Sequence, residues 1–213
     1  MAEPERHLRA DAERNRRKLL DAAAFEFREN GLEVCITRIA ERAGVGRGTV
    51  FRHFPSKAEL VAAIVVQRMQ EAADRGRARL EDPDPREALF AFLEETLGSR
   101  RLDRALLDGV GETFLGNAQI RAALTEVVLI LDALLHRAQE RGTLRRDVSA
   151  LDVLMMIKGV CEATGALRHV DPDIANRQFD LVRAALSAPS SGDPLRGRAL
   201  TLEDVERAFA VAA

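Results

Sequence analysis

Four side chains that can read DNA bases fall within one short stretch of the chain. They lie on the outer side of one predicted short helix: Arg47, Thr49, Arg52 and His53. An arginine guanidinium can bond guanine bidentately in the major groove, and a threonine can offer its methyl group to thymine. Gly48 has no side chain, so the helix backbone can come close to a duplex. The pattern therefore favours a base-reading surface.

Three predicted helices would position that surface. The first, residues 10–30, repeats apolar residues at helical spacing and ends where Gly31 suits a left-handed backbone. The second, residues 37–43, is capped by its threonine and leads into a glycine-containing turn. The third, residues 47–53, stops because Pro55 disfavours helix at the residue before it. Short helices with a glycine turn between the second and third are typical of a helix-turn-helix.

Other residues are predicted to contact the phosphates of the same duplex. Thr37 stands at a helix N-terminus, whose free N–H groups bind phosphate. Lys57 falls in the first turn of the next helix, which Ser56 caps and Glu59 supports through a capping box. The residues expected to contact DNA are Thr37, Arg38, Arg47, Gly48, Thr49, Phe51, Arg52, His53 and Lys57.

The segment Ile36–Leu60, ITRIAERAGVGRGTVFRHFPSKAEL, resembles the signature of TetR-type regulators, roughly T-x-x-I-A-x-x-A-G-V-S-x-G-T-x-Y-x-H-F-x-S-K-x-x-L. The resemblance in detail covers residues 10–65. Gly46 replaces the usual capping serine at a cost of about a few tenths of a kcal/mol. Phe51 replaces a common tyrosine, which removes one phosphate hydrogen bond in each subunit. The resemblance implies a homodimeric repressor that a small-molecule ligand releases from a near-palindromic operator in double-stranded DNA.

Composition argues against several other classes of protein. The net charge is −2, but residues 1–60 hold 12 Lys and Arg against 10 Asp and Glu, which allows a mildly basic N-terminal part. Cys35 and Cys161 fit no metal or redox spacing, and no apolar run approaches the roughly 20 residues that cross a membrane. We expect a cytoplasmic protein that is not an enzyme, with no catalytic residue, metal, cofactor or membrane contact. A helical adaptor that binds only proteins stays open as the alternative.

The whole chain is predicted to be all-α, because apolar residues never alternate strictly over a useful length. We expect an N-terminal three-helix helix-turn-helix domain and a larger C-terminal helical domain for ligand binding and dimerisation. The predicted divisions are a flexible N-terminus 1–9, a helix-turn-helix domain 10–55, a connecting helix 56–80, a ligand-binding and dimerisation domain 81–187, and a linker with a C-terminal helix 188–213. Predicted helices within the body are 86–98, 101–110, 117–141, 149–168 and 171–186.

Two sets of apolar residues in the body are candidates for its functions. The helix after Ser149 is apolar on nearly all sides, so one of its faces needs a second partner, which a dimer would supply. A thick monomer core is the alternative reading of both sets. The predicted interface is Val153, Ile157, Val160, Thr164, Phe179, Val182 and Leu186. The predicted ligand pocket is Phe90, Leu93, Leu97, Phe114, Leu115, Val127, Leu131, Met155 and Cys161.

A basic cluster, Arg14, Arg16, Arg17 and Lys18, precedes the helix-turn-helix. It could reach neighbouring phosphates or the minor groove of a duplex. It is equally consistent with an exposed helix start whose charge Asp11 and Glu13 balance. The sequence leaves both interpretations open.

Overall fold

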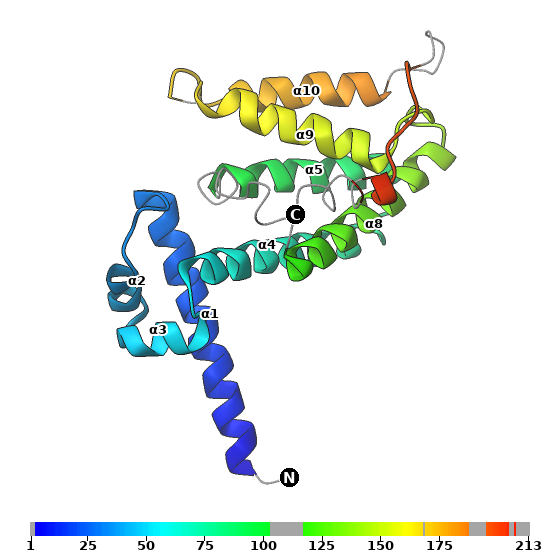
Figure 1. Cartoon of the computed structure of the whole chain (residues 1–213). Helices are drawn as coiled ribbons and strands as arrows, with labels where there is room; N and C mark the ends of the chain where they lie inside the picture. The colour runs from blue at the N-terminus through cyan, green and yellow to red at the C-terminus, as the bar shows by residue number, and fades with distance from the viewer. Residues whose placement is uncertain (1–2, 103–116, 168, 188–194, 205–206, 208–213) are drawn as a thin grey trace. The chain divides into compact units, whose positions relative to one another are not determined.

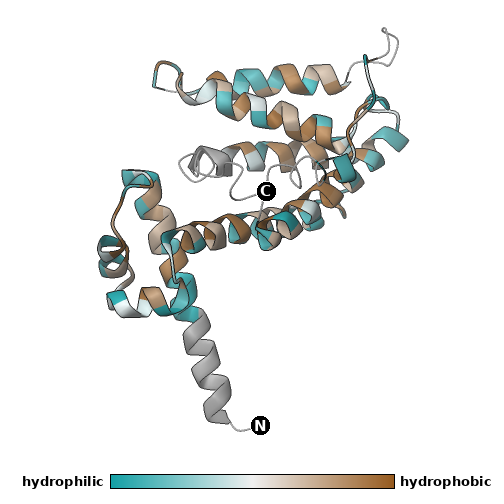
Figure 2. Ribbon diagram, in the orientation of Figure 1, coloured by the Kyte–Doolittle hydropathy of each residue, from teal (hydrophilic) through white to brown (hydrophobic). Residues whose placement is uncertain are grey.

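The fold is taken from a computed structural model, which describes residues 3–102, 117–167, 169–187, 195–204 and 207. These residues form helices and loops and contain no strand, which confirms the predicted all-α fold. They divide into two compact units, one reaching Gln67 and one beginning at Arg68 (Figure 1). Hydrophilic and hydrophobic residues are interspersed along the helices, as expected for helices with one buried face (Figure 2).

The first unit is built on α1, Glu3–Asn30. Gly31, with φ +71°, ends this helix as predicted. The helix begins at Glu3 instead of near Ala10, because proline at position 4 is tolerated in a first turn and the charged residues after it are good helix formers. Its apolar stripe is completely buried at Leu19, Ala23 and Phe27.

Two short helices follow α1 in the same unit. They are α2, Ile36–Ala43, and α3, Arg47–His53, and each contacts its predecessor along the chain. Ile39, Ala40 and Val50 are buried where the helices meet. The predicted three-helix arrangement is therefore confirmed.

Helix α4, Lys57–Arg79, starts in the first unit and ends in the second. The backbone N–H of Glu59 donates to Ser56 Oγ at 3.1 Å, so Ser56 caps α4 as predicted. The predicted break after this helix is also present, since residues 82–84 are not helical.

The second unit adds α5, Pro85–Leu102, whose start Asp84 caps by accepting from two backbone N–H groups. We predicted an interruption at Gly98, and this was wrong: α5 continues through it to Leu102. A single glycine costs a helix only about 1 kcal/mol, which packing can outweigh. The predicted helix 101–110 lies almost entirely outside the described residues.

Three further helices complete the described part of this unit: α8, Ala118–Glu140; α9, Ala150–Gly165; and α10, Ile174–Ser187. The side chain of Asn117 accepts from two backbone N–H groups at the start of α8. Ser149 and Asp152 form a reciprocal capping box at the start of α9. Both starts agree with the predicted ones to within a residue.

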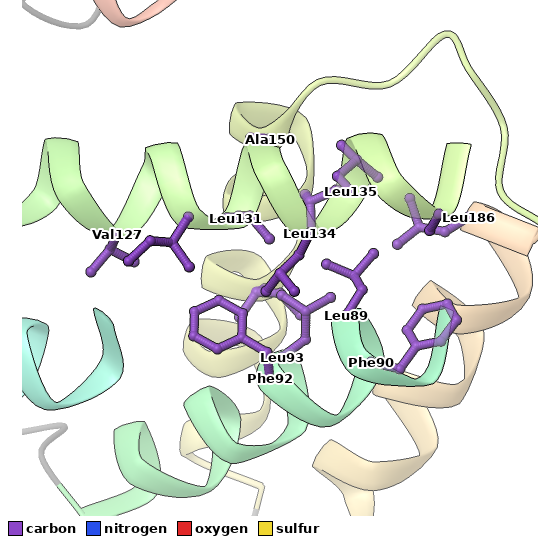
Figure 3. Packing of buried hydrophobic residues seen from close by; sticks show 14 of the residues in the cluster. Leu89, Phe90, Phe92, Leu93, Val127, Leu131, Leu134, Leu135, Ala150 and Leu186 are labelled. Atoms are coloured by element: carbon purple, nitrogen blue, oxygen red, sulfur yellow. The ribbon is translucent and has the colours of Figure 1, made fainter. Parts of the chain in front are cut away.

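One hydrophobic core holds these helices together (Figure 3). Helix α5 contacts α8 and α9, and α9 contacts α8 and α10. The rings of Phe90 and Phe179 meet edge-on with centroids 6.4 Å apart. Burying a phenylalanine or leucine side chain contributes about 1.5–3 kcal/mol, so this core supplies the main stabilisation of the unit. Its labelled members are Leu89, Phe90, Phe92, Leu93, Val127, Leu131, Leu134, Leu135, Ala150 and Leu186.

The second half of α4 packs tightly in the same unit. A Cβ atom placed on Gly76 would lie 2.5 Å from Ile130 Cγ2 of α8 and 3.0 Å from a Phe92 ring carbon of α5. Arg77 pairs with Glu126 of α8 next to this contact. A glycine is therefore required where the α4 backbone approaches both neighbours.

The tail is described only in part. The predicted linker 188–197 lies outside the described residues up to position 194, and residues 195–201 are not helical. Of the predicted helix 201–211, residues 201–204 and 207 are described, and all of these except residue 201 are helical. Among the helices that the structure describes, none is long and apolar enough to cross a membrane.

Candidate nucleic-acid interface

The turn between α2 and α3 fixes the geometry of the predicted base-reading helix. Gly44, with φ +68°, follows the last residue of α2 in a left-handed conformation that costs a glycine little. The backbone N–H of Val45 donates to Ala40 O at 3.0 Å and closes the turn. Gly46 is extended and caps α3 without a side chain. The tight turn expected from the sequence is therefore present.

The outer face of α3 carries ordered polar side chains. Arg52 donates from Nη2 to Thr49 Oγ1 at 3.0 Å, which holds both residues on one face. The Arg47 guanidinium lies over the Phe51 ring, with its carbon 5.4 Å from the ring centroid. Arg47 and Arg52 are exposed and Thr49 is half-buried. Two arginines held five residues apart on one short helix can reach guanine edges along a major groove.

Phe51 and His53 differ in their surroundings. The Phe51 side chain is 39% exposed although it is aromatic, and its ring supports Arg47. His53 is half-buried, with its ring centroid 6.3 Å from that of Phe54. His53 thus lies at the edge of the exposed face, while Gly48 is exposed near its centre.

The residues predicted to bind phosphate lie at two helix starts. Lys57 is the first residue of α4 and is half-buried. Thr37 is exposed in the first turn of α2, but our prediction that it caps this helix was wrong. The cap residue is Cys35, which has an extended backbone and makes no side-chain cap hydrogen bond.

Arg38, also predicted to contact DNA, pairs with a buried carboxylate. Its Nε lies 2.8 Å from Oε2 of Glu26, a residue of α1 that is only 1% exposed. Arg42, one turn further along α2, places its Nε 2.5 Å from Oε1. Asn30 donates to Oε2 at 2.8 Å. Glu26 thus joins α1 to α2 through two arginines, and Asn30 of its own helix is a third polar partner.

Sequence reasoning missed Glu26. The available signal was an acidic residue three positions after the buried Ala23, combined with arginines at i and i+4 on the helix that packs against α1. The Arg42 guanidinium also lies 3.7 Å from the Phe25 ring centroid, which helps to hold it in place.

The polar partners of Glu26 determine its acidity. The hydrogen bond from Arg42 is the largest influence and holds the pKa of Glu26 below its ordinary value. The positive charges of Arg38 and Arg42 act in the same direction, whereas burial opposes them by raising the pKa. Glu26 is therefore ionised at neutral pH and offsets one of the two positive charges.

In the second unit, the residues predicted for the dimer interface lie mostly in the core of the same chain. These side chains are buried within one chain, or partly buried in the case of Val160, and the Thr164 hydroxyl group donates to Val160 O at 2.7 Å. Sequence periodicity showed that α9 is apolar on most sides but not which side packs inward. The residues of this prediction are Val153, Ile157, Val160, Thr164, Phe179, Val182 and Leu186. For Val160, which is only partly buried, a place in an interface stays a prediction.

The predicted ligand-pocket residues separate into three groups. Met155 is 49% exposed on α9 and does not belong to the buried core, so its place in a pocket stays a prediction. Phe114 and Leu115 lie outside the described residues. The remaining residues belong to the core or pack against it: Phe90, Leu93, Leu97, Val127, Leu131 and Cys161. Within the described residues, no group of His, Cys, Asp and Glu could hold a metal ion.

Two family models match the chain. Residues 19–64 match the bacterial regulatory proteins of the tetR family, and residues 84–188 match the C-terminal domain of SbtR-like transcriptional regulators. The first match contains α2 and α3, and the second contains the core of the second unit.

Curated relatives match over part of their length. The HTH-type transcriptional repressor KstR of Rhodococcus jostii is 29% identical over 134 residues, which cover 62% of this chain and 63% of the relative. An HTH-type transcriptional regulator of Staphylococcus aureus is 40% identical over 59 residues, 27% of this chain and 32% of the relative. The chain thus spans less than two thirds of each of these two proteins.

Solved structures match over nearly their whole length. A TetR transcription regulatory protein from Mycobacterium vanbaalenii is 32% identical, with a TM-score of 0.65 over 85% of this chain and 99% of that one. A TetR transcriptional regulator from Streptomyces coelicolor is 27% identical, with a TM-score of 0.64 over 83% and 99%.

The carboxylate of Glu26 gives the first unit a pH-dependent stability that can be measured. Because the pKa of Glu26 in the folded chain is below its ordinary value of 4.5, the contribution is present above about pH 4.5 and is lost as the pH falls through the lowered value. We expect Glu26→Gln to melt at a lower temperature than the wild type at neutral pH. The difference should shrink as the pH falls below 4.5.

Thermal unfolding followed by circular dichroism checks this expectation. Glu29→Gln is the matched control, because Glu29 is exposed and pairs only with its neighbour Arg28 among the described residues. The control should melt close to the wild type at every pH. A deficit of Glu26→Gln that is the same in acid as at neutral pH would contradict the role of the charge.

Proposed function

The chain belongs to the TetR family of bacterial regulatory proteins, and from this premise we propose that it represses transcription as a homodimer bound to a near-palindromic DNA operator. The observation that carries the proposal is the exposed face of α3, where Arg47 and Arg52 are held by Phe51 and Thr49. In a two-fold dimer, two such helices would enter successive major grooves at two half-sites.

The proposed roles divide the contact residues by what they touch. Arg47, Thr49 and Arg52 read base edges, with Gly48 allowing a close approach and His53 at the margin. Thr37, Arg38 and Lys57 bind phosphates and set the register of the helix on the duplex. Phe51 lacks a hydroxyl group and acts through Arg47, since its ring lies against that guanidinium.

A second copy of the chain is proposed to cover the outer face of α9 and α10. Met155 and Leu181 are 49% and 57% exposed there, although both are large and apolar. Gly159 and Ala163 on the same side of α9 are exposed and small, so a second backbone could approach closely. Two helices from each protomer would then form a four-helix interface.

A small apolar molecule is proposed to release the operator by favouring a second arrangement of the dimer. The support is that the predicted pocket residues of α5 and α8 lie together in one buried apolar cluster. Such surroundings suit an apolar ligand with few polar groups.

Substitution of the base-reading arginines tests the proposal directly. We expect Arg47→Ala and Arg52→Ala each to weaken binding to a duplex selected from a random pool by about 1–3 kcal/mol and to broaden the selected sequence. Fluorescence anisotropy measures the affinity. Arg141→Ala, an exposed arginine that ends α8, should bind like the wild type. A protein that selects no sequence from the pool would favour the adaptor alternative.

Charge placed on the proposed interface tests the dimer. Leu181→Glu should give monomers in sedimentation velocity, because an unpaired carboxylate would be buried between two copies. Leu129→Glu is the matched control, since Leu129 is 56% exposed on α8 and outside the proposed interface. Dimers that persist in Leu181→Glu, with circular dichroism unchanged, would place the interface elsewhere.

A ligand screen tests the release. Apolar compounds that raise the melting temperature of the protein should also displace the selected duplex, because both effects follow from binding to one state. Compounds that stabilise the protein and leave the duplex bound would contradict a coupling between the two sites.

A further inference from the structure

Helix α1 carries a strongly basic turn directly before the buried residue Leu19. Residues 14–18, here called the basic turn, have the sequence RNRRK, and all five are exposed. Within the described part of the chain, neither Arg17 nor Lys18 has an ion pair with a carboxylate. Their charges are therefore available to an anionic partner.

The basic turn has a fixed place beside the base-reading helix. Arg16 is exposed but lies three residues before the buried Leu19, and its guanidinium carbon lies 5.1 Å from the centroid of the Phe54 ring. Phe54 is buried and ends α3. Arg16 thus ties the basic turn to the C-terminal end of α3, within a single unit.

Helix α1 continues well beyond that contact. It begins at Glu3, and the stretch from there to Arg16 would be about 20 Å long at 1.5 Å a residue. Figure 1 shows α1 extending past α2 and α3 toward its N-terminus. The basic turn itself lies at the Arg16–Phe54 contact, so its side chains flank the C-terminal end of α3, while the rest of α1 extends further from it.

We propose that the basic turn is a second DNA-binding surface, which contacts backbone phosphates of the duplex outside the base pairs that α3 reads. This inference rests on the proposed function, since α3 must first place the duplex. A duplex presents one negative charge about every 1.7 Å, so a helix that lies along it with unpaired Arg17 and Lys18 meets phosphates whatever the flanking sequence. The contact adds affinity without adding sequence preference.

The test varies the flanks of the duplex. The full chain is titrated with a duplex selected from a random pool, in a core length and with about one helical turn of arbitrary sequence added at each end. We expect the wild type to bind the longer duplex several-fold more tightly. The double variant Arg17→Ala with Lys18→Ala should bind both lengths equally, with a salt slope smaller by about 0.9 for each lost phosphate contact.

A matched double variant controls for net charge. Arg141→Ala with Arg196→Ala removes two exposed arginines from the second unit and should keep the gain from the flanks. Alanine favours helix and both basic-turn sites are exposed, so circular dichroism should show the basic-turn variant folded.

The outcomes separate the inference from the proposed function. If the wild type gains nothing from the flanks, or the basic-turn variant keeps the whole gain, the inference is overturned while binding to the core duplex still supports a regulator. Equal weakening on both lengths would place the basic turn on the core operator, which also overturns the inference. If the wild type binds no duplex selectively, the proposed function itself fails.

Discussion

The reading surface of this protein depends on the packing of α2 onto α1 and of α3 onto α2. Helices as short as α2 and α3 are marginal in water by themselves, because helix nucleation costs more than a few hydrogen bonds return. Their shape comes from Ile39, Ala40 and Val50, which are buried in the first unit with the apolar stripe of α1. The positions of Arg47 and Arg52 are therefore set by residues that would never touch DNA.

The buried carboxylate of Glu26 adds a polar contact between α1 and α2. The buried carboxylate of Glu26 would be costly without partners, but three donors on two helices satisfy it. The same contacts fix the side chains of Arg38 and Arg42 and lower the net positive charge at that end of α2. One of the two positive charges at that end of α2 remains, beside those of α3, of Lys57 and of residues 14–18 of α1.

The sequence was sufficient to predict what depends on local signals, and insufficient where tertiary contacts decide. Ser56, Asn117 and Ser149 begin helices as their residue types indicate, and Gly31 ends one. The helix-turn-helix was predictable because its turn needs glycine and its core needs a set order of small and branched residues. The inward face of α9 was not predictable, since apolar residues surround that helix and only the positions of α5, α8 and α10 decide which are buried. The partnership of Glu26 with α2 also escaped, because it joins residues far apart in the chain.

Because Gly76 has no side chain, movements of α5 and α8 would act directly on the backbone of α4. A methyl group of Ile130 and the ring of Phe92 would meet a Cβ at this position, so they rest against main-chain atoms of α4. Side chains can absorb a small displacement by changing rotamer, but a helix backbone cannot. A shift of α8 or α5 at this contact would thus be passed on as a movement of α4 as a rigid rod. Because α4 is continuous from Lys57 to Arg79, the close contact at Gly76 leaves no flexible side chain of α4 to take up such a shift.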